Sequence, residues 1–137
     1  MSDDRQRQER EIEHMTRMLD AWNRADARAT ASYYAEEVEY RDPSVPDGIH
    51  GRRDLEKYLG LIFKLWPEQH WEVTELFPHK KPGAYSCSYT FRIANDNTEI
   101  TGHGIDRLEF TGGKVSLNHV YLNAGKWNDW LKSELRR

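Results

Sequence analysis

The feature that most constrains the fold is a change in the spacing of apolar residues at Pro67. Before this proline, apolar side chains recur every three or four residues, as on a helix, and after it they alternate, as on a strand. Helices followed by consecutive hairpin strands predict an α+β domain. A length of 137 residues suits one domain, so we expect residues 1–137 to form a single domain.

Three helices are predicted before Pro67. The polar residues 1–9 are expected to fray. The next residues carry one apolar stripe at helical spacing, which consists of Ile12, Met15, Leu19 and Trp22, with Met18 beside it. Residues 27–35 predict a shorter helix, and residues 55–66 predict a third helix that Pro67 ends.

Alternation after Pro67 predicts a sheet of consecutive strands, preceded by a short strand at 39–41. The expected later strands are 71–77, 85–93, 100–110 and 115–122. One face of the first of these is expected to present Trp71, Val73, Glu75 and Phe77. Tight turns are predicted at 95–97 and 111–114, and a last helix at 127–135. A curved antiparallel sheet around the helices would form a cone, whose mouth would hold one apolar ligand.

Composition excludes several classes of partner. The net charge of -3 shows no basic excess of the kind that nucleic acids and anionic membranes attract. No apolar run approaches membrane-spanning length and the first residues are charged throughout, so we expect a cytoplasmic protein. Cys87 is the only cysteine, which excludes an internal disulfide and a cysteine metal cluster. No histidine pair has metal-ligand spacing, so we expect neither a metal nor a cofactor.

Asp42 is the first candidate for chemistry. Pro43 restricts the backbone of this acid to extended forms and so holds its carboxylate at the end of the short strand. At a strand end the carboxylate would stand at the edge of any cavity. The alternative interpretation is structural, because Asp-Pro also starts turns and caps loops.

Asp106 is the second candidate. Alternation places Gly104, Asp106 and Leu108 on one face of their strand, and Arg107 and Glu109 on the other. The charged pair predicts that its own face is solvated, so Asp106 would point toward the apolar side. A carboxylate there loses water, and its pKa should rise. The alternative is that the strand is exposed at this point and Asp106 is simply solvated.

Neighbouring side chains predict the lining of a pocket. Alternation gives one face to Cys87, Tyr89, Phe91 and Ile93 and another to Asn118, Val120 and Leu122. We interpret the first set, with Met18 and Trp22, as core or cavity lining. His50 could approach the cavity mouth from the loop after Asp42, whereas His103 lies on the face opposite Asp106.

The order of these segments resembles the NTF2-like superfamily, and within it the branch of ketosteroid isomerases and SnoaL-like polyketide cyclases. The resemblance covers roughly residues 12 to 123, and its most specific parts are YYAEEVEYRDP and GHGIDRLEF followed by a GK turn. It implies a cone of three helices and a curved sheet, without a cofactor. It also implies a homodimer through the outer face of the sheet.

The resemblance implies roles for both acids. Asp42 falls on the position of the isomerase base, which abstracts a proton next to a carbonyl, and Asp106 falls on the acid that stays protonated and donates to the oxyanion. The tyrosine donors of the isomerases are replaced by Met18 on the first helix and Leu59 on the third, with Tyr58 adjacent. One such donor contributes about 3 kcal/mol, so its loss argues against efficient steroid isomerisation.

The first functional hypothesis is therefore an enzyme that performs acid–base isomerisation or cyclisation on a small apolar ligand, with Asp42 as base and Asp106 as acid. Tyr89 or Asn118 could supply the missing donor. The second hypothesis is a non-catalytic module for ligand binding or dimerisation. A third is a dehydratase, which needs His50 or His103 inside the pocket, or an epoxide hydrolase, which needs an arginine between two acids.

Overall fold

The computed structural model describes residues 2–124, which fold into helices at the start and a six-stranded sheet after them. The predicted helix at 127–135 lies outside the described residues. The elements in chain order are α1 (Ser2–Asn23), α2 (Ala27–Ala31), β1 (Tyr34–Arg41), β2 (Ile49–His50), α3 (Arg52–Leu65), β3 (Glu68–Pro78), β4 (Ala84–Ala94), β5 (Glu99–Thr111) and β6 (Lys114–Ala124).

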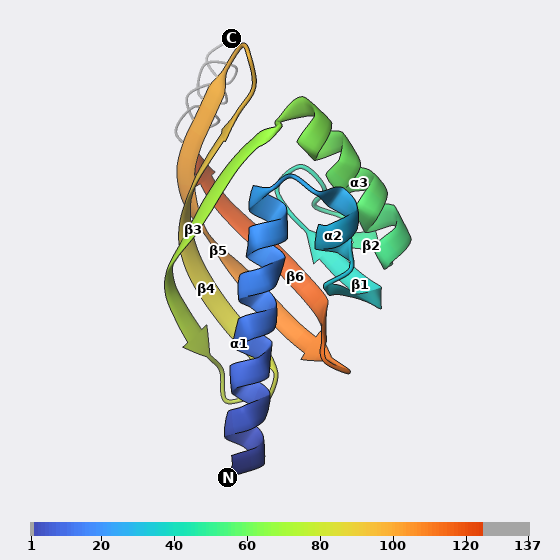
Figure 1. Cartoon of the computed structure of the whole chain (residues 1–137), viewed down its shortest axis with the longest axis vertical. Helices are drawn as coiled ribbons and strands as arrows, with labels where there is room; N and C mark the ends of the chain where they lie inside the picture. Colours follow the sequence, from blue (N-terminus) through green and yellow to red (C-terminus); the bar gives the residue numbers. More distant parts are fainter. Residues whose placement is uncertain (1, 125–137) are drawn as a thin grey trace.

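The α+β class is confirmed, and the sheet has the order β2-β1-β6-β5-β4-β3. Figure 1 shows the long strands curving behind α1, with α2 and α3 beside that helix. Strands β3 to β6 form consecutive antiparallel hairpins, as their alternation predicts. The sheet is mixed rather than wholly antiparallel, because β1 pairs parallel with β6. The many elements between these two strands leave enough chain for a parallel crossover.

Helix α1 begins at Ser2, whereas the sequence predicts that the first nine residues fray. Asp3 and Asp4 lie in its first turn, where negative charge interacts favourably with the helix dipole. Arg5 pairs with Glu9 at 3.3 Å across one turn, and such a pair adds about 0.2–0.5 kcal/mol. Charge pairs of this kind stabilise the first turns of α1, although these turns carry few apolar residues.

Two other boundaries differ from the prediction. Helix α2 ends at Ala31 and β1 begins at Tyr34, so the predicted strand at 39–41 is only the end of a longer one. In β3 the register shifts between Val73 and Glu75, and this bulge breaks the predicted shared face. After the bulge Leu76 lines the cavity in place of Phe77, which is 49% exposed. Trp71 and Val73 also line the cavity, and Val73 does so from its rim, since it is 44% exposed.

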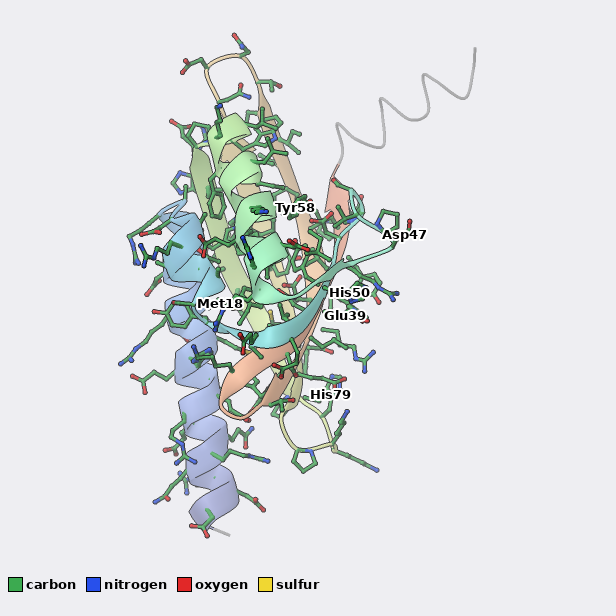
Figure 2. All side chains as sticks on the ribbon, turned by 90° about the vertical axis from the view of Figure 1, so that its right-hand side faces the viewer. Met18, Glu39, Asp47, His50, Tyr58 and His79 are labelled. Carbon is green, nitrogen blue, oxygen red and sulfur yellow. The ribbon has the colours of Figure 1, made fainter. Side chains whose placement is uncertain are left out.

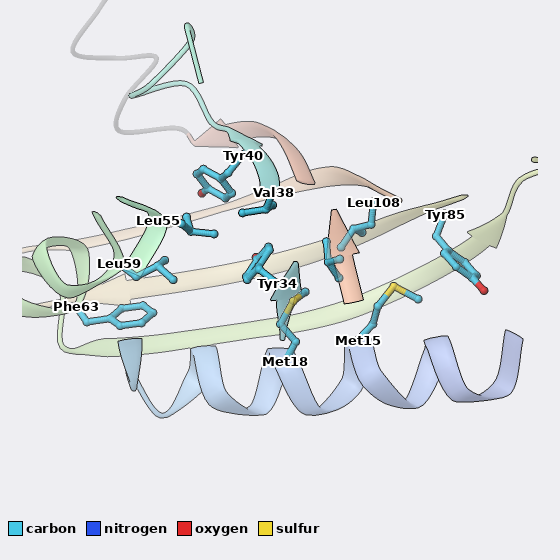
Figure 3. Close-up of a cluster of buried hydrophobic side chains, with 11 residues drawn as sticks. Met15, Met18, Tyr34, Val38, Tyr40, Leu55, Leu59, Phe63, Tyr85 and Leu108 are labelled. Carbon is cyan, nitrogen blue, oxygen red and sulfur yellow. The ribbon is translucent and has the colours of Figure 1, made fainter. Parts of the chain in front are cut away.

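The core lies between the helices and the concave face of the sheet (Figure 3). Its buried members come from α1, β1, α3 and the sheet, and they are Met15, Met18, Tyr34, Val38, Tyr40, Leu55, Leu59, Phe63, Tyr85, Leu108 and Val115. Glu11 ties α1 to this core, since its buried carboxylate accepts a hydrogen bond from Tyr85 Oη at 2.7 Å.

The outer face of the sheet exposes a small apolar pair. Ile105 and Tyr121 are direct cross-strand neighbours, and they are 50% and 61% exposed. The homodimer expected through this face stays a prediction. Within residues 2–124, no helix has both the length and the apolar character needed to cross a membrane.

Candidate functional site

A cavity of about 700 Å³ opens between the helices and the concave face of the sheet, and both candidate acids line it. Most of the rest of its lining is apolar or aromatic. Of the predicted substrate-contacting residues, those that line it are Met18, Trp22, Tyr58, Cys87, Tyr89, Phe91, Leu108, Asn118 and Val120. Leu59 is the exception, because it is fully buried in the core and does not reach the cavity. Its neighbour Tyr58, also on α3 (Figure 2), lines the cavity instead.

Asp42 is held by four hydrogen bonds at the end of β1. The hydroxyls of Tyr40 and Tyr58 donate to its Oδ2 at 2.8 and 2.7 Å. The backbone amides of Ser44 and Val45 donate to its Oδ1 at 2.7 and 3.3 Å. Both interpretations of the Asp-Pro pair therefore hold, because Asp42 caps the loop through one oxygen and lines the cavity. A carboxylate has about four acceptor positions, and three of these donors serve Asp42 fully, whereas the Val45 amide also donates to the Asp42 backbone carbonyl at 3.0 Å.

Asp106 lies on β5 and receives fewer donors. Tyr89 Oη donates to its Oδ1 at 2.6 Å, and Asn118 Nδ2 donates to its Oδ2 at 3.0 Å. Tyr34 Oη donates to Asn118 Oδ1 at 2.7 Å and so fixes the orientation of that amide. The inward direction predicted from alternation is confirmed by these contacts. About two acceptor positions of Asp106 remain for a ligand.

Burial raises the pKa of Asp106 from 3.8 to about 6. The hydrogen bonds from Tyr89 and Asn118 act in the opposite direction, and the charge of Asp42 adds a further increase. Since both acids face one cavity, the charge on one disfavours the charge on the other. A carboxyl group with a pKa near neutrality can both release and accept a proton at physiological pH.

The raised pKa of Asp106 predicts how stability depends on pH. The folded chain holds this proton more tightly than the unfolded chain, so its contribution to stability is present below about pH 4 and is lost as the pH rises to about 6. Over two pKa units the loss amounts to about 3 kcal/mol. Urea unfolding between these pH values should show this fall in the wild type and a much flatter profile in Asp106→Asn. An equal fall in both proteins would contradict the assignment.

Gln69 organises the aromatic wall of the cavity. Its side-chain oxygen accepts hydrogen bonds from the indoles of Trp22 at 3.2 Å and Trp71 at 2.8 Å, and its amide nitrogen donates to the carbonyl of Trp66. Trp71 stacks on Phe91 at 4.6 Å. The buried amide thereby fixes both indoles where a ligand would meet them.

Replacing Gln69 with leucine should leave two indole donors without their acceptor. We expect a loss of about 2 kcal/mol in the free energy of unfolding, together with a shift in tryptophan emission. Urea unfolding followed by fluorescence measures both effects. Unchanged emission would show that the indoles keep their positions without Gln69.

Gly104 stands directly beside the Asp106 network. A Cβ at this position would lie 2.6 Å from the carbonyl oxygen of Tyr121 and 2.9 Å from Tyr89 Oη. No side chain fits there without displacing one of these groups. The glycine therefore allows the Tyr89 hydroxyl to reach Asp106.

The third functional hypothesis is not supported by the positions of its residues. His50 and His103 are both exposed and neither lines the cavity, and His50 lies beside Glu39 on the sheet edge (Figure 2). A dehydratase that uses either histidine inside the pocket is thus contradicted. Arg107 pairs with Glu109 on the outer face and bridges no pair of acids in the cavity. Among residues 2–124, no group of three His, Cys, Asp or Glu side chains is placed to hold a metal ion.

Sequence reasoning missed three polar residues of the site. Tyr34 and Tyr40 lie on β1, the early part of which the sequence predicts as helix. Alternation of Val38 and Tyr40 with polar neighbours was an available signal for Tyr40, whereas a register shift after Tyr34 removes that signal for Tyr34. Gln69 is only 2% exposed, and nothing in the sequence around Trp71 predicts that this polar residue is buried.

Cys87 lines the cavity, and burial raises the pKa of its thiol to about 12, so it is not a thiolate nucleophile.

Comparison with known proteins places this geometry in a family. Residues 15–118 match the model of the SnoaL-like domain. No curated protein sequence is significantly similar to the chain.

Three solved structures illustrate the shared fold. An LEH-like epoxide hydrolase from M. tuberculosis is 15% identical, with a TM-score of 0.74 over 93% of this chain and 90% of that one. SalBIII, an epoxide hydrolase/cyclase-like enzyme of pyran ring formation in salinomycin, is 20% identical, with a TM-score of 0.71 over 90% and 95%. A Catenulispora acidiphila protein with a ketosteroid isomerase-like fold, solved with trimethylamine, is 14% identical, with a TM-score of 0.71 over 80% and 84%. Such identities show the fold alone, and together with the domain match they establish that this chain belongs to the SnoaL-like family of the NTF2-like superfamily.

Proposed function

We propose that this protein is an acid–base enzyme that moves a proton on a small apolar ligand, from a carbon next to a carbonyl, in an isomerisation or cyclisation. The observation that supports this most directly is Asp106, a carboxyl group with a pKa of about 6 and free acceptor positions in a largely apolar cavity. General bases work best when their pKa lies near the operating pH.

The hydrogen bonds suggest how the two acids divide the work. The resemblance gives the base to Asp42 and the acid to Asp106, and that division stays a prediction. We propose the reverse assignment, with Asp106 as the base, because Asp42 accepts hydrogen bonds from four groups and Asp106 from only two. Asp106 takes the proton from carbon and returns it to another atom, while Asp42 keeps its hydrogen bonds and does not take the proton.

Exchange of the α-protons of 2-tetralone in D₂O tests this function, because this ketone is apolar, fits the cavity and has an acidic C–H bond. NMR should show catalysed exchange whose rate rises with pH through about 6 and then levels off. Tyr58→Phe should leave the rate within about threefold, since it removes one donor from Asp42 and leaves both donors of Asp106 in place. A much higher exchange rate in Tyr58→Phe would instead indicate Asp42 as the base. A wild-type protein that catalyses no exchange would support the hypothesis of a non-catalytic binding module.

A further inference from the structure

The charged side chains that line the cavity are all acidic. They are Asp20, which is exposed, and Asp42 and Asp106, which are partly buried. No lysine, arginine or histidine occurs among the described residues that form this lining. As far as residues 2–124 form it, the lining therefore carries negative charge and no positive side chain.

The groups that hold the two partly buried acids are neutral. Asp42 and Asp106 accept hydrogen bonds from tyrosine hydroxyls, backbone amides and the Asn118 amide, and none of these donors brings a charge. The cations of the nearby strands pair with other acids, since Arg107 contacts Glu109 and Arg41 lies 4.0 Å from Glu39. Partly buried charges are costly unless an opposite charge compensates them.

Aromatic rings cover much of the remaining wall. Trp22, Trp71, Tyr89 and Phe91 form one contiguous group, in which Trp71 contacts the other three at centroid distances of 6.0, 5.2 and 4.6 Å. Tyr40 and Tyr58 contact each other beside Asp42. The faces of aromatic rings attract organic cations, most strongly where water is excluded. The aromatic and the acidic side chains of the lining thus favour the same kind of ligand.

We propose that the ligand of this cavity is an apolar organic cation, in which hydrocarbon surrounds an ammonium group. The ammonium would supply the positive charge that the described lining lacks, and its hydrocarbon would fill the aromatic part of the 700 Å³ space. This inference deepens the proposed function and rests on it for the carbon that Asp106 deprotonates. A positive charge on the ligand would also offset the negative charge that forms when that proton leaves.

Three probes of one shape test the charge preference. Benzyltrimethylammonium is the cation, neopentylbenzene is its uncharged carbon isostere, and 2,2-dimethyl-3-phenylpropanoate is a related anion. Binding can be followed by tryptophan fluorescence, because Trp22 and Trp71 line the cavity. At about pH 8 the cation should bind at least tenfold more tightly than the isostere, and the anion most weakly. An isostere that binds as tightly as the cation would overturn the proposal, as would no binding of the cation up to about 10 mM.

Charge-removing variants locate the effect. Asp42→Asn and Asp106→Asn should each reduce the cation-to-isostere preference several-fold, while Asp96→Asn, an exposed change in the β4–β5 turn, should leave it intact. A thermal melt shows which variants fold. If Asp42→Asn does not fold, the cation-to-isostere preference of Asp106→Asn alone tests the proposal. A preference that survives in the folded cavity variants would refute the proposal. Binding and 2-tetralone exchange are separate readouts, so a cation preference without exchange would refute only the proposed function.

Discussion

Asp106→Asn should slow the exchange of 2-tetralone α-protons by about 10²–10⁴-fold, the usual contribution of a positioned acid–base group. The amide has the size of the carboxyl group but cannot take a proton. With its oxygen toward the Asn118 amide and its nitrogen toward the Tyr89 hydroxyl, which can accept, it keeps both partners. The rate constant is measured by NMR at saturating ketone. The plateau above about pH 6 should disappear together with the rate.

Asp96→Asn is the matched control for this result. It makes the same chemical change at an exposed turn outside the cavity lining, so exchange should continue at the wild-type rate. Circular dichroism of both variants separates lost chemistry from lost folding. Asp106→Asn that is folded and still exchanges protons at the wild-type rate would remove Asp106 from the proposed reaction.

Gly104→Ala should damage both stability and activity, although it adds a single methyl group. Its Cβ would lie within 3.0 Å of a backbone oxygen and of the Tyr89 hydroxyl, so the strand or Tyr89 must shift. Overpacking of this kind costs about 1–3 kcal/mol, and displacing Tyr89 removes one hydrogen bond from Asp106. We expect urea unfolding at lower concentration and exchange slowed by about tenfold.

Gly60→Ala provides the opposite control. Gly60 lies in α3, and a Cβ added there would meet no atom within 4 Å. Alanine in a helix is favoured over glycine by about 0.5–1 kcal/mol, so this variant should be slightly more stable and equally active. A Gly104→Ala protein as stable as Gly60→Ala would show that β5 and β6 adjust without cost.

The fold was largely predictable because it follows from periodicity. The stripe on α1 and the alternation of β4, β5 and β6 depend on local spacing, and the structure confirms them. The bulge after Val73 was not predictable, because the same alternating residues satisfy either register and neighbouring strands decide between them. Parallel pairing of β1 with β6 is likewise a property of tertiary packing.

The site was predictable in part. Asp106 could be placed because Arg107 and Glu109 mark the solvated face of its strand. The surroundings of Asp42 could not, because Tyr58 reaches it from α3 and no local pattern records a contact between separate elements. The resemblance places Leu59 at the pocket, yet a rotation of one residue along the helix brings Tyr58 there and buries Leu59 in the core.

The parallel pairing of β1 and β6 has a consequence for the order of assembly. It sets Tyr40 beside Asn118, so the strand that leads to Asp42 is joined to the strand that steadies Asp106 by a contact between distant parts of the sequence. Contacts of such long sequence separation form late, because a large loop must close first. We therefore expect the local hairpins of β3 to β6 to form before β1 docks on β6, so that Asp42 and Asp106 share a cavity only after this docking.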